Sequence, residues 1–120
     1  MAMTREEVEK QIAAASRRGS PLSLPGADLR GADLSGLDLA GADLSGAVLA
    51  GAILREANLS EANLGQADLQ GADLEEAVLD DAVLDEADVA GANFRNASMV
   101  GTGLEGVNLD EAILEGARFL

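Results

Sequence analysis

From Leu22 to its last residue the chain repeats every five residues, without an insertion. The units read GADLR, GADLS, GLDLA, GADLS and so on to GARFL, and each has an apolar residue at its centre. Sixteen of the twenty centres, which run from Leu24 to Phe119, are Leu. The other four centres are Val89, Phe94, Met99 and Phe119. Ala stands two residues before the centre in sixteen units. An uninterrupted internal repeat is typical of a solenoid, in which each unit packs on its neighbours.

A period of five excludes both a long helix and a long flat strand. An α-helix turns by about 100° per residue, so centres five residues apart would spiral around it and form no apolar face. In a strand, successive side chains alternate between two faces, so an odd period sends neighbouring centres to opposite faces. Gly stands at eleven of the nineteen junctions between units, and Asp, Glu, Asn or Gln at the others. We therefore expect each unit to be a short extended segment followed by a turn.

This pattern resembles the pentapeptide-repeat family, whose unit is usually written A(D/N)LXX. The resemblance covers residues 22–120. It implies an all-β fold, a right-handed parallel β-helix of square cross-section with four units in each coil. The twenty units of this chain would then make five coils. Centres twenty residues apart, such as Leu24, Leu44 and Leu64, would stack along the tube.

Leu and Ala of each unit are expected to point inward and to fill a narrow bore. The large centres Phe94, Met99 and Phe119 all fall in the last two coils. We therefore expect the bore to widen or to distort there.

Residues 4–18 follow the rules for a helix instead. Thr4 and Glu7 have the spacing of a capping box, and acidic residues come early and basic residues late, which complements the helix dipole. Gly19 is expected to end the helix, and the two prolines that follow prevent its resumption. A narrow apolar stripe contains Val8, Ile12 and Ala15.

A helix of this length is marginal on its own in water, so we expect it to cover one end of the tube. Residues 1–21 are accordingly predicted to be a capping helix and linker, and residues 22–120 the β-helix. At the other end Ile113, Phe119 and Leu120 would lie near an uncovered edge, which favours association. Two interpretations stay open: two chains meet end to end as a homodimer through their C-terminal coils, or the chain is part of something longer.

The composition excludes most kinds of active site. The chain has no His, Cys, Trp or Tyr, so it lacks the commonest general base, every thiol nucleophile and the usual ligands of zinc. Paired carboxylates such as Glu75 and Glu76 would face solvent on a convex tube, where nothing raises a pKa. The sequence therefore predicts a protein that is not an enzyme and has no catalytic, cofactor-binding or metal-binding residues.

Asp or Asn precedes the centre in many units, for example Asp28 and Asn58. Ladders of such residues could bind Ca²⁺, but the glycine-paired nine-residue pattern of calcium β-helices is absent. We expect these side chains to accept hydrogen bonds from the turn backbone. No apolar run has the length of a signal peptide or of a membrane span, and with no Cys a cytoplasmic location is expected.

The net charge of −14 disfavours nucleic acid and acidic membranes as partners. No base lies between Arg55 and Arg95, where the sequence predicts an acidic interaction surface. Its eleven acids are Glu56, Glu61, Asp68, Asp73, Glu75, Glu76, Asp80, Asp81, Asp85, Glu86 and Asp88. Coils about 4.8 Å apart would give the repeats about one net charge per 1.6 Å, close to the value of about one per 1.7 Å for duplex DNA.

These features favour a protein–protein interaction or scaffold module whose partner is a protein. The resemblance implies one alternative, because some pentapeptide-repeat proteins tied to quinolone resistance imitate DNA and inhibit type II topoisomerases such as DNA gyrase. Those inhibitors tend to be longer, and several carry a projecting loop or C-terminal helix that this uninterrupted chain lacks.

Overall fold

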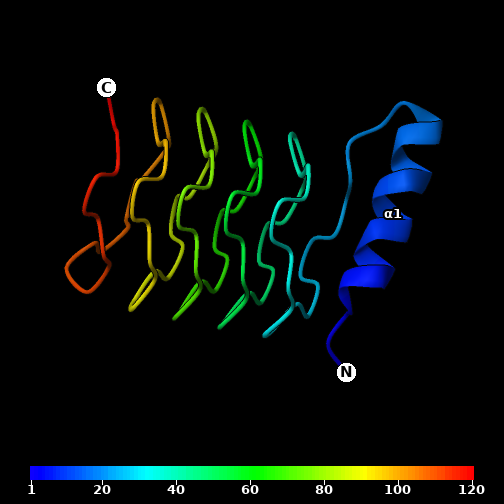
Figure 1. Ribbon diagram of the computed structural model, residues 1–120, viewed down its shortest axis with the longest axis horizontal. Coiled ribbons are helices and arrows are strands. Elements are labelled where there is room, and N and C mark those ends of the chain that lie inside the picture. Colours follow the sequence, from blue (N-terminus) through cyan, green and yellow to red (C-terminus); the bar gives the residue numbers. More distant parts are fainter.

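The computed structural model describes residues 1–120 as one helix followed by a stack of coils (Figure 1). Fifteen isolated parallel bridges join residues that are twenty apart, for example Asp43 with Asn63. Residues twenty apart therefore lie side by side in successive coils, as the family resemblance implies. We number the coils one to five: residues 22–41, 42–61, 62–81, 82–101 and 102–120.

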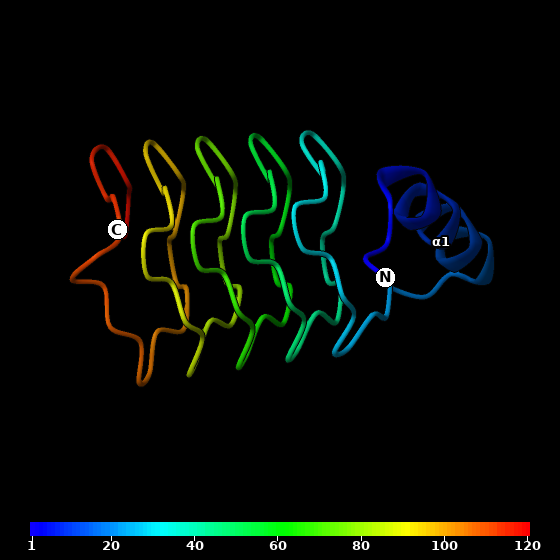
Figure 2. The same cartoon turned by 90° about the horizontal axis from the view of Figure 1, so that it is seen from below.

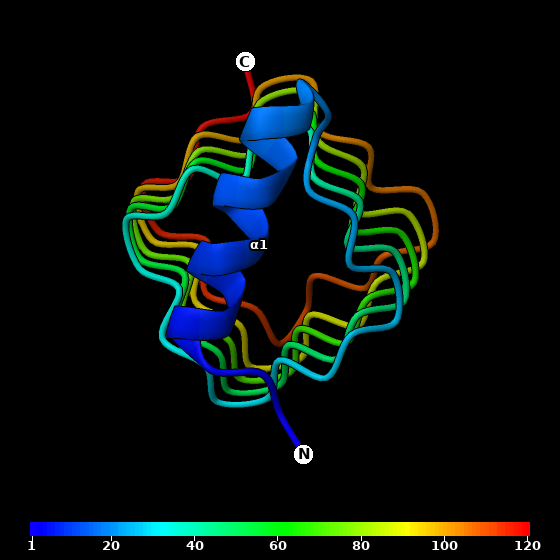
Figure 3. The same cartoon turned by 90° about the vertical axis from the view of Figure 1, so that its right-hand side faces the viewer.

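Each coil has four sides that meet at turns (Figure 3). We name the sides A, B, C and D after the centres of coil one, which are Leu24, Leu29, Leu34 and Leu39. Two of every five residues form the turn, so each extended segment contributes a single bridge residue and no continuous strand. The expected β-structure is thus a ladder of isolated bridges and not a set of long strands.

Main-chain hydrogen bonds join each coil to both neighbours. The amide of each regular centre donates to a carbonyl nineteen residues later, as from Leu44 to Asn63 at 2.7 Å. The amide of the residue before the centre donates back by twenty-one residues, as from Asn63 to Ala42 at 2.8 Å. The amide at the junction also donates forward, as from Gly46 to Gly65 at 2.8 Å. These bonds hold the coils together at every turn of the chain.

The junction residues adopt the left-handed conformation that favours Gly. Seven junctions in coils two to four hold another residue, with φ between 58° and 63°. They are Glu56, Glu61, Gln66, Glu76, Asp81, Glu86 and Asn96. A side chain in this conformation costs about 1 kcal/mol relative to Gly. Five acidic side chains therefore stand at positions where Gly would be less strained.

The bore is filled by the centres and by the residues two before them. The core consists only of apolar side chains, and Leu64 and Ala62 in coil three are fully buried. Phe94 and Met99 in coil four are also buried, at 0% and 1% exposure, and the bridges around them are intact. The regular stack therefore accommodates both large centres.

The expected distortion occurs only in coil five, on side B. The bridge that would join Asp88 to Asn108 is missing, and the amide of Gly91 donates to Glu111 instead of the residue before it. Figure 2 shows the orange chain swinging away from the preceding coil there. Val107 stands on this side where coils two to four have Ala, whereas the large centres lie on sides C and D, where the bridges to coil five are intact.

Helix α1, Arg5–Arg18, confirms the predicted helix. Thr4 Oγ1 accepts from the Glu7 amide at 3.2 Å, and Glu7 Oε1 accepts from the Thr4 amide at 3.0 Å, which completes the capping box. Val8 and Ala15 are buried, and α1 lies across the end of coil one (Figures 1 and 3). The helix thus covers apolar side chains that coil one would otherwise expose. No helix is both long and apolar enough to cross a membrane.

Candidate interaction surface

The eleven predicted acids form a belt around coils two to four, not a patch on one side. Asp85 lies on side A, Asp68 and Asp88 on side B, Asp73 and Glu75 on side C, and Asp80 on side D. The other five occupy junctions: Glu56, Glu61, Glu76, Asp81 and Glu86. We call these five the corner acids. All five are exposed, and none of their side chains makes a hydrogen bond or an ion pair within the chain, whereas their backbone amides donate to the next coil. They are therefore free to contact a partner.

Asp or Asn before a centre has a structural role, as predicted. Asp68 Oδ1 accepts from the Gln70 amide at 3.0 Å, and Asp73 Oδ1 accepts from the Glu75 amide at 3.1 Å. The same bond, from the amide two residues later, occurs in the other units of this type. Those units hold Asp28, Asp33, Asp38, Asp43, Asn58, Asn63, Asp88, Asn93 and Asn108. Each of these side chains fixes the turn of its own unit.

Asp80 and Asp85 fix turns one coil away from their own. Units 98 and 103 have Ser and Gly where others have Asp or Asn. Asp80 Oδ1 accepts from the Val100 amide at 3.0 Å and from the Ser98 hydroxyl at 2.6 Å. Asp85 Oδ1 likewise accepts from the Glu105 amide at 3.3 Å. The sequence contained a signal for this exchange, because Ser98 and Gly103 each have an Asp eighteen residues before them.

Replacing Asp80 by Ala is expected to lower the free energy of unfolding by about 1–2 kcal/mol, because the amide of Val100 loses a charged acceptor. Asp80→Asn keeps an acceptor oxygen and should cost less. Urea unfolding followed by circular dichroism measures both, with Glu76→Ala as the control at an exposed acid without a bond. Equal stability of Asp80→Ala and Glu76→Ala would contradict the assignment.

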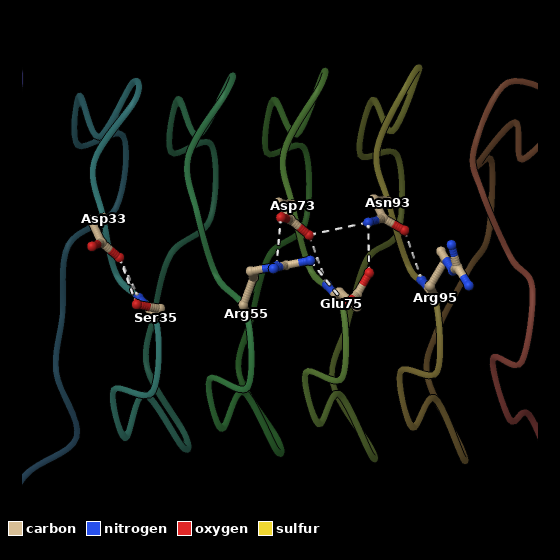
Figure 4. A network of polar contacts seen from close by, with 7 residues as sticks. All are labelled: Asp33, Ser35, Arg55, Asp73, Glu75, Asn93 and Arg95. Carbon is tan, nitrogen blue, oxygen red and sulfur yellow. Dashed lines mark hydrogen bonds and ion pairs between the residues drawn. The ribbon is translucent and has the colours of Figure 1, made fainter.

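Arg55 neutralises part of the belt. Its Nε lies 2.8 Å from Asp73 Oδ2, and its Nη2 lies 2.9 Å from Glu75 Oε2 (Figure 4). Asn93 Nδ2 donates to the same two acids from the next coil, at 3.2 and 3.4 Å. Arg95 Nη2 continues the series to Glu115 at 3.3 Å. Side C is therefore a ladder of alternating charge.

Asp73 and Glu75 are thus paired with Arg55 and contribute less charge to the predicted acidic interaction surface than the sequence indicates. The sequence stretch without bases is about two coils long, so Arg55 at its start stacks against acids inside it, whereas Arg95 at its end pairs with Glu115 in coil five. A distance of twenty residues along the chain is one step between neighbouring coils. The acidic excess that remains lies on sides A, B and D and at the junctions.

Three carboxylates of coils one and two have lowered pKa values. Hydrogen bonds from the Arg30 side chain and amide lower the pKa of Asp28 to about 2. The hydroxyl of Ser35, and then its amide, lower the pKa of Asp33, and Ser45 does the same to Asp43. These shifts stabilise the charged form, which is opposite to the shift that a general acid needs at neutral pH.

One small cavity of about 150 Å³ lies between α1, the segment that follows it and side D of coil one. Its lining residues are Ile12, Ser16, Ser20, Pro21, Leu22, Asp38 and Ala40. The sequence did not predict it, because the cavity arises where the helix meets the first coil. None of the eleven belt acids contributes to it, and no group of three or more acids is placed to hold a metal ion.

The three residues that were predicted at the C-terminal edge make up only part of that edge. Ile113, Phe119 and Leu120 are all exposed, by 47%, 38% and essentially the whole side chain. Phe119 is a centre and lies at the open end of the bore, whereas Ile113 precedes a centre on side C. The half-buried centres Leu104 and Leu114 belong to this end and were not among the predicted residues.

The chain matches the family described as Pentapeptide repeats (8 copies), over residues 27–66, 57–96 and 90–119. No curated protein matches the chain. Among solved structures, Rfr23, a pentapeptide repeat protein from the cyanobacterium Cyanothece 51142, is 41% identical with a TM-score of 0.63. The match covers 81% of this chain and 63% of that one, so this chain spans slightly less than two thirds of Rfr23.

A second pentapeptide repeat protein, alr5209 from Nostoc Pcc 7120, is 34% identical with a TM-score of 0.76 over 100% of this chain and 99% of that one. QnrB1, a plasmid-mediated fluoroquinolone resistance protein, is 19% identical with a TM-score of 0.34 over 82% of this chain and 60% of that one, which carries no functional argument. The family match spans residues 27–119 and extends over far more than half of the sequence. This chain therefore belongs to the pentapeptide repeat family.

Proposed function

We propose that this chain is a right-handed quadrilateral β-helix, with residues 1–21 as its capping segment, that binds a basic protein partner without catalysis. In Figure 3 the chain runs clockwise as it leads away from α1, which is the sense of a right-handed coil. The observation that carries the functional proposal is the position of the corner acids. Their side chains project from the turns of coils two to four, are exposed and have no hydrogen-bond or ion-pair partner within the chain.

Solubility alone does not account for these positions. An acid on a flat side, one residue after a centre, would add the same charge without a left-handed backbone. Each corner acid costs about 1 kcal/mol relative to Gly, and strain of this kind is concentrated at functional sites. Glu56 and Glu76 stack on one corner, and Glu61 and Asp81 stack on the next. These two columns flank side D and would steer a cationic surface toward it.

The experiment is an affinity capture from an extract of the native cell, with the wild-type chain and a variant lacking the corner acids as paired baits. A protein retained by the wild type and lost by the variant is then purified, and its dissociation constant is measured by calorimetry. Capture of the same proteins by both baits, or of none by the wild type, would reject the proposal.

The second candidate is an acidic mimic of DNA that inhibits a type II topoisomerase such as DNA gyrase. The observation in its favour is that the two columns of corner acids run along the tube as parallel rows of negative charge. Inhibition of gyrase supercoiling that weakens with added salt would support this candidate. Supercoiling that continues unchanged at high micromolar protein would exclude it.

We also propose an end-to-end homodimer through coil five. The amides of Leu104, Leu114 and Phe119 have no acceptor, and the carbonyls of Ala112 and Ala117 have no donor. Both kinds of group are thus present at one edge, which makes that edge self-complementary. Across the tube the Cα atoms extend 29 × 22 Å. Contact over this area would bury roughly 1,200 Å² in total, at the lower end of stable interfaces.

Phe119→Glu is expected to convert the dimer to a monomer, because it places a charge at the apolar end of the bore. Light scattering measures the change as a halving of mass. Ile53→Glu is the matched control, since Ile53 is 38% exposed, like Phe119, and lies in coil two, three coils from the edge. A monomeric wild type, or a Phe119→Glu variant that is still dimeric, would exclude the dimer.

A further inference from the structure

The N-terminal segment completes the hydrogen bonds at the edge of coil one. In the regular stack, the carbonyl before each centre accepts a bond from a main-chain amide of the preceding coil. Coil one has no preceding coil. The amide of Met3 nevertheless donates to the Asp28 carbonyl at 2.8 Å, the ladder distance found elsewhere. Met3 therefore stands in for one residue of a missing coil on side B.

Arg5 stands in for two more main-chain donors on side C. Its Nη1 donates to the carbonyls of Asp33 at 3.2 Å and Ser35 at 2.9 Å. One coil further on, the corresponding carbonyls of Ile53 and Arg55 accept from amides at 2.7 and 2.9 Å. The guanidinium thus takes the place of two amides. Arg suits this position because its planar group offers only donors.

Further contacts hold Arg5 in place. Its Nη1 lies 3.7 Å from Asp33 Oδ1, and its Nε lies 3.6 Å from Glu9 Oε2. The first turn of α1 begins at Arg5, and Val8 anchors that turn with 1% exposure. One segment therefore has both roles: Arg5 supplies hydrogen bonds to the edge of coil one, and α1 covers the apolar bore.

The opposite end of the stack carries the complementary groups. The centre amides of Leu104, Leu114 and Phe119 in coil five have no acceptor. Equivalent amides in coils one to four donate to the carbonyls of the next coil. Coil five of one copy therefore has the donors and the spacing to stack on coil one of another copy. Met3, Arg5 and α1 occupy the place where that copy would bind.

We propose that Met3–Arg5 and α1 are a terminator, which prevents a second copy of this chain from stacking its coil five on coil one. The terminator leaves coil five as the only end available for contact between copies. Exposed ladder edges add further chains unless something covers them. The proposal requires neither the corner acids nor the coil-five dimer, although stacking on coil one would compete with that dimer because both use coil five.

The test uses the full chain with the double substitution Arg5→Met and Val8→Asp, which removes the two donor bonds and the apolar anchor. Sedimentation velocity is expected to show species larger than the wild-type state that grow with protein concentration, while circular dichroism still reports a folded β-helix. The matched control is Lys10→Met with Gln11→Asp, the same changes at exposed positions of α1. The control should sediment like the wild type.

Phe119→Glu added to the double variant should reduce the large species, because it blocks the coil-five end. Two results would overturn the proposal: sedimentation of the double variant like the wild type, or large species that persist after Phe119→Glu. If the double variant loses its folded spectrum, Arg5→Met alone decides, since it leaves the apolar anchor intact. That variant should shift in the same direction by a smaller amount, and an unchanged profile would reject the terminator.

Discussion

Replacing Leu64 by Ala is expected to lower the free energy of unfolding by about 2–5 kcal/mol. Leu64 is a centre of coil three and is fully buried between coils two and four. The hydrogen bonds on both sides of this coil fix the width of the bore, so the walls cannot collapse into the space that the side chain leaves. Most of the cavity should therefore remain, and the free energy of unfolding should fall by the full cost of that cavity.

Urea unfolding followed by circular dichroism measures this loss. Leu109→Ala is the matched control, because Leu109 is a half-buried centre on the distorted side of coil five. It should cost roughly 1 kcal/mol, since less apolar surface leaves water there on folding. Equal losses for the two variants would mean that the middle of the stack is no better packed than its end.

Changing Glu56, Glu61, Glu76 and Asp81 together to Lys is expected to weaken binding of a basic partner at least about tenfold, which is about 1.4 kcal/mol. Each substitution adds two charges, so the net charge changes from −14 to −6. The four side chains are exposed and make no hydrogen bond or ion pair within the chain, so the fold should be retained. Gyrase inhibition, if present, should fall in parallel.

The control places the same four charges elsewhere, by changing Glu6, Glu105, Asp110 and Glu111 to Lys. This control separates the position of the charge from its total. Glu75 and Asp80 stay unchanged in both variants, because one holds Arg55 and the other holds the Val100 amide. Similar weakening by both variants, or binding that does not respond to salt, would contradict a role for the corners.

The five-residue repeat made the register predictable once the family resemblance supplied the number of units in each coil. Four units form each coil, so centres twenty residues apart stack, and the bridges occur at this spacing. The Asp and Asn turns and the capping box were predictable for a related reason, because each involves residues at most three apart in sequence. Local hydrogen bonds of this kind depend on residue type and spacing alone.

Contacts between coils were harder to predict because they join residues about twenty apart. Arg55 appeared to border an acidic stretch, whereas it contacts Asp73 and Glu75 in the next coil. Asp80 was predicted only as part of the acidic interaction surface, and its hydrogen bond from the Val100 amide in the next coil was not predicted. Arg5 gave no signal at all, because its partners are backbone carbonyls that no side-chain pattern encodes.

Single-residue bridges also determine how this molecule can change in length. Every coil in the regular part contacts its neighbours through the same bonds, so the excision of residues 62–81 would bring coil two against coil four with the centres still aligned. Both ends would keep their own contacts. The excision would remove Glu76 and Asp81 and leave one acid in each column, whereas duplication of the same residues would add one acid to each column at the same spacing. Gain or loss of whole coils can therefore change the length of the charged columns during evolution while the contacts at both ends of the tube stay the same.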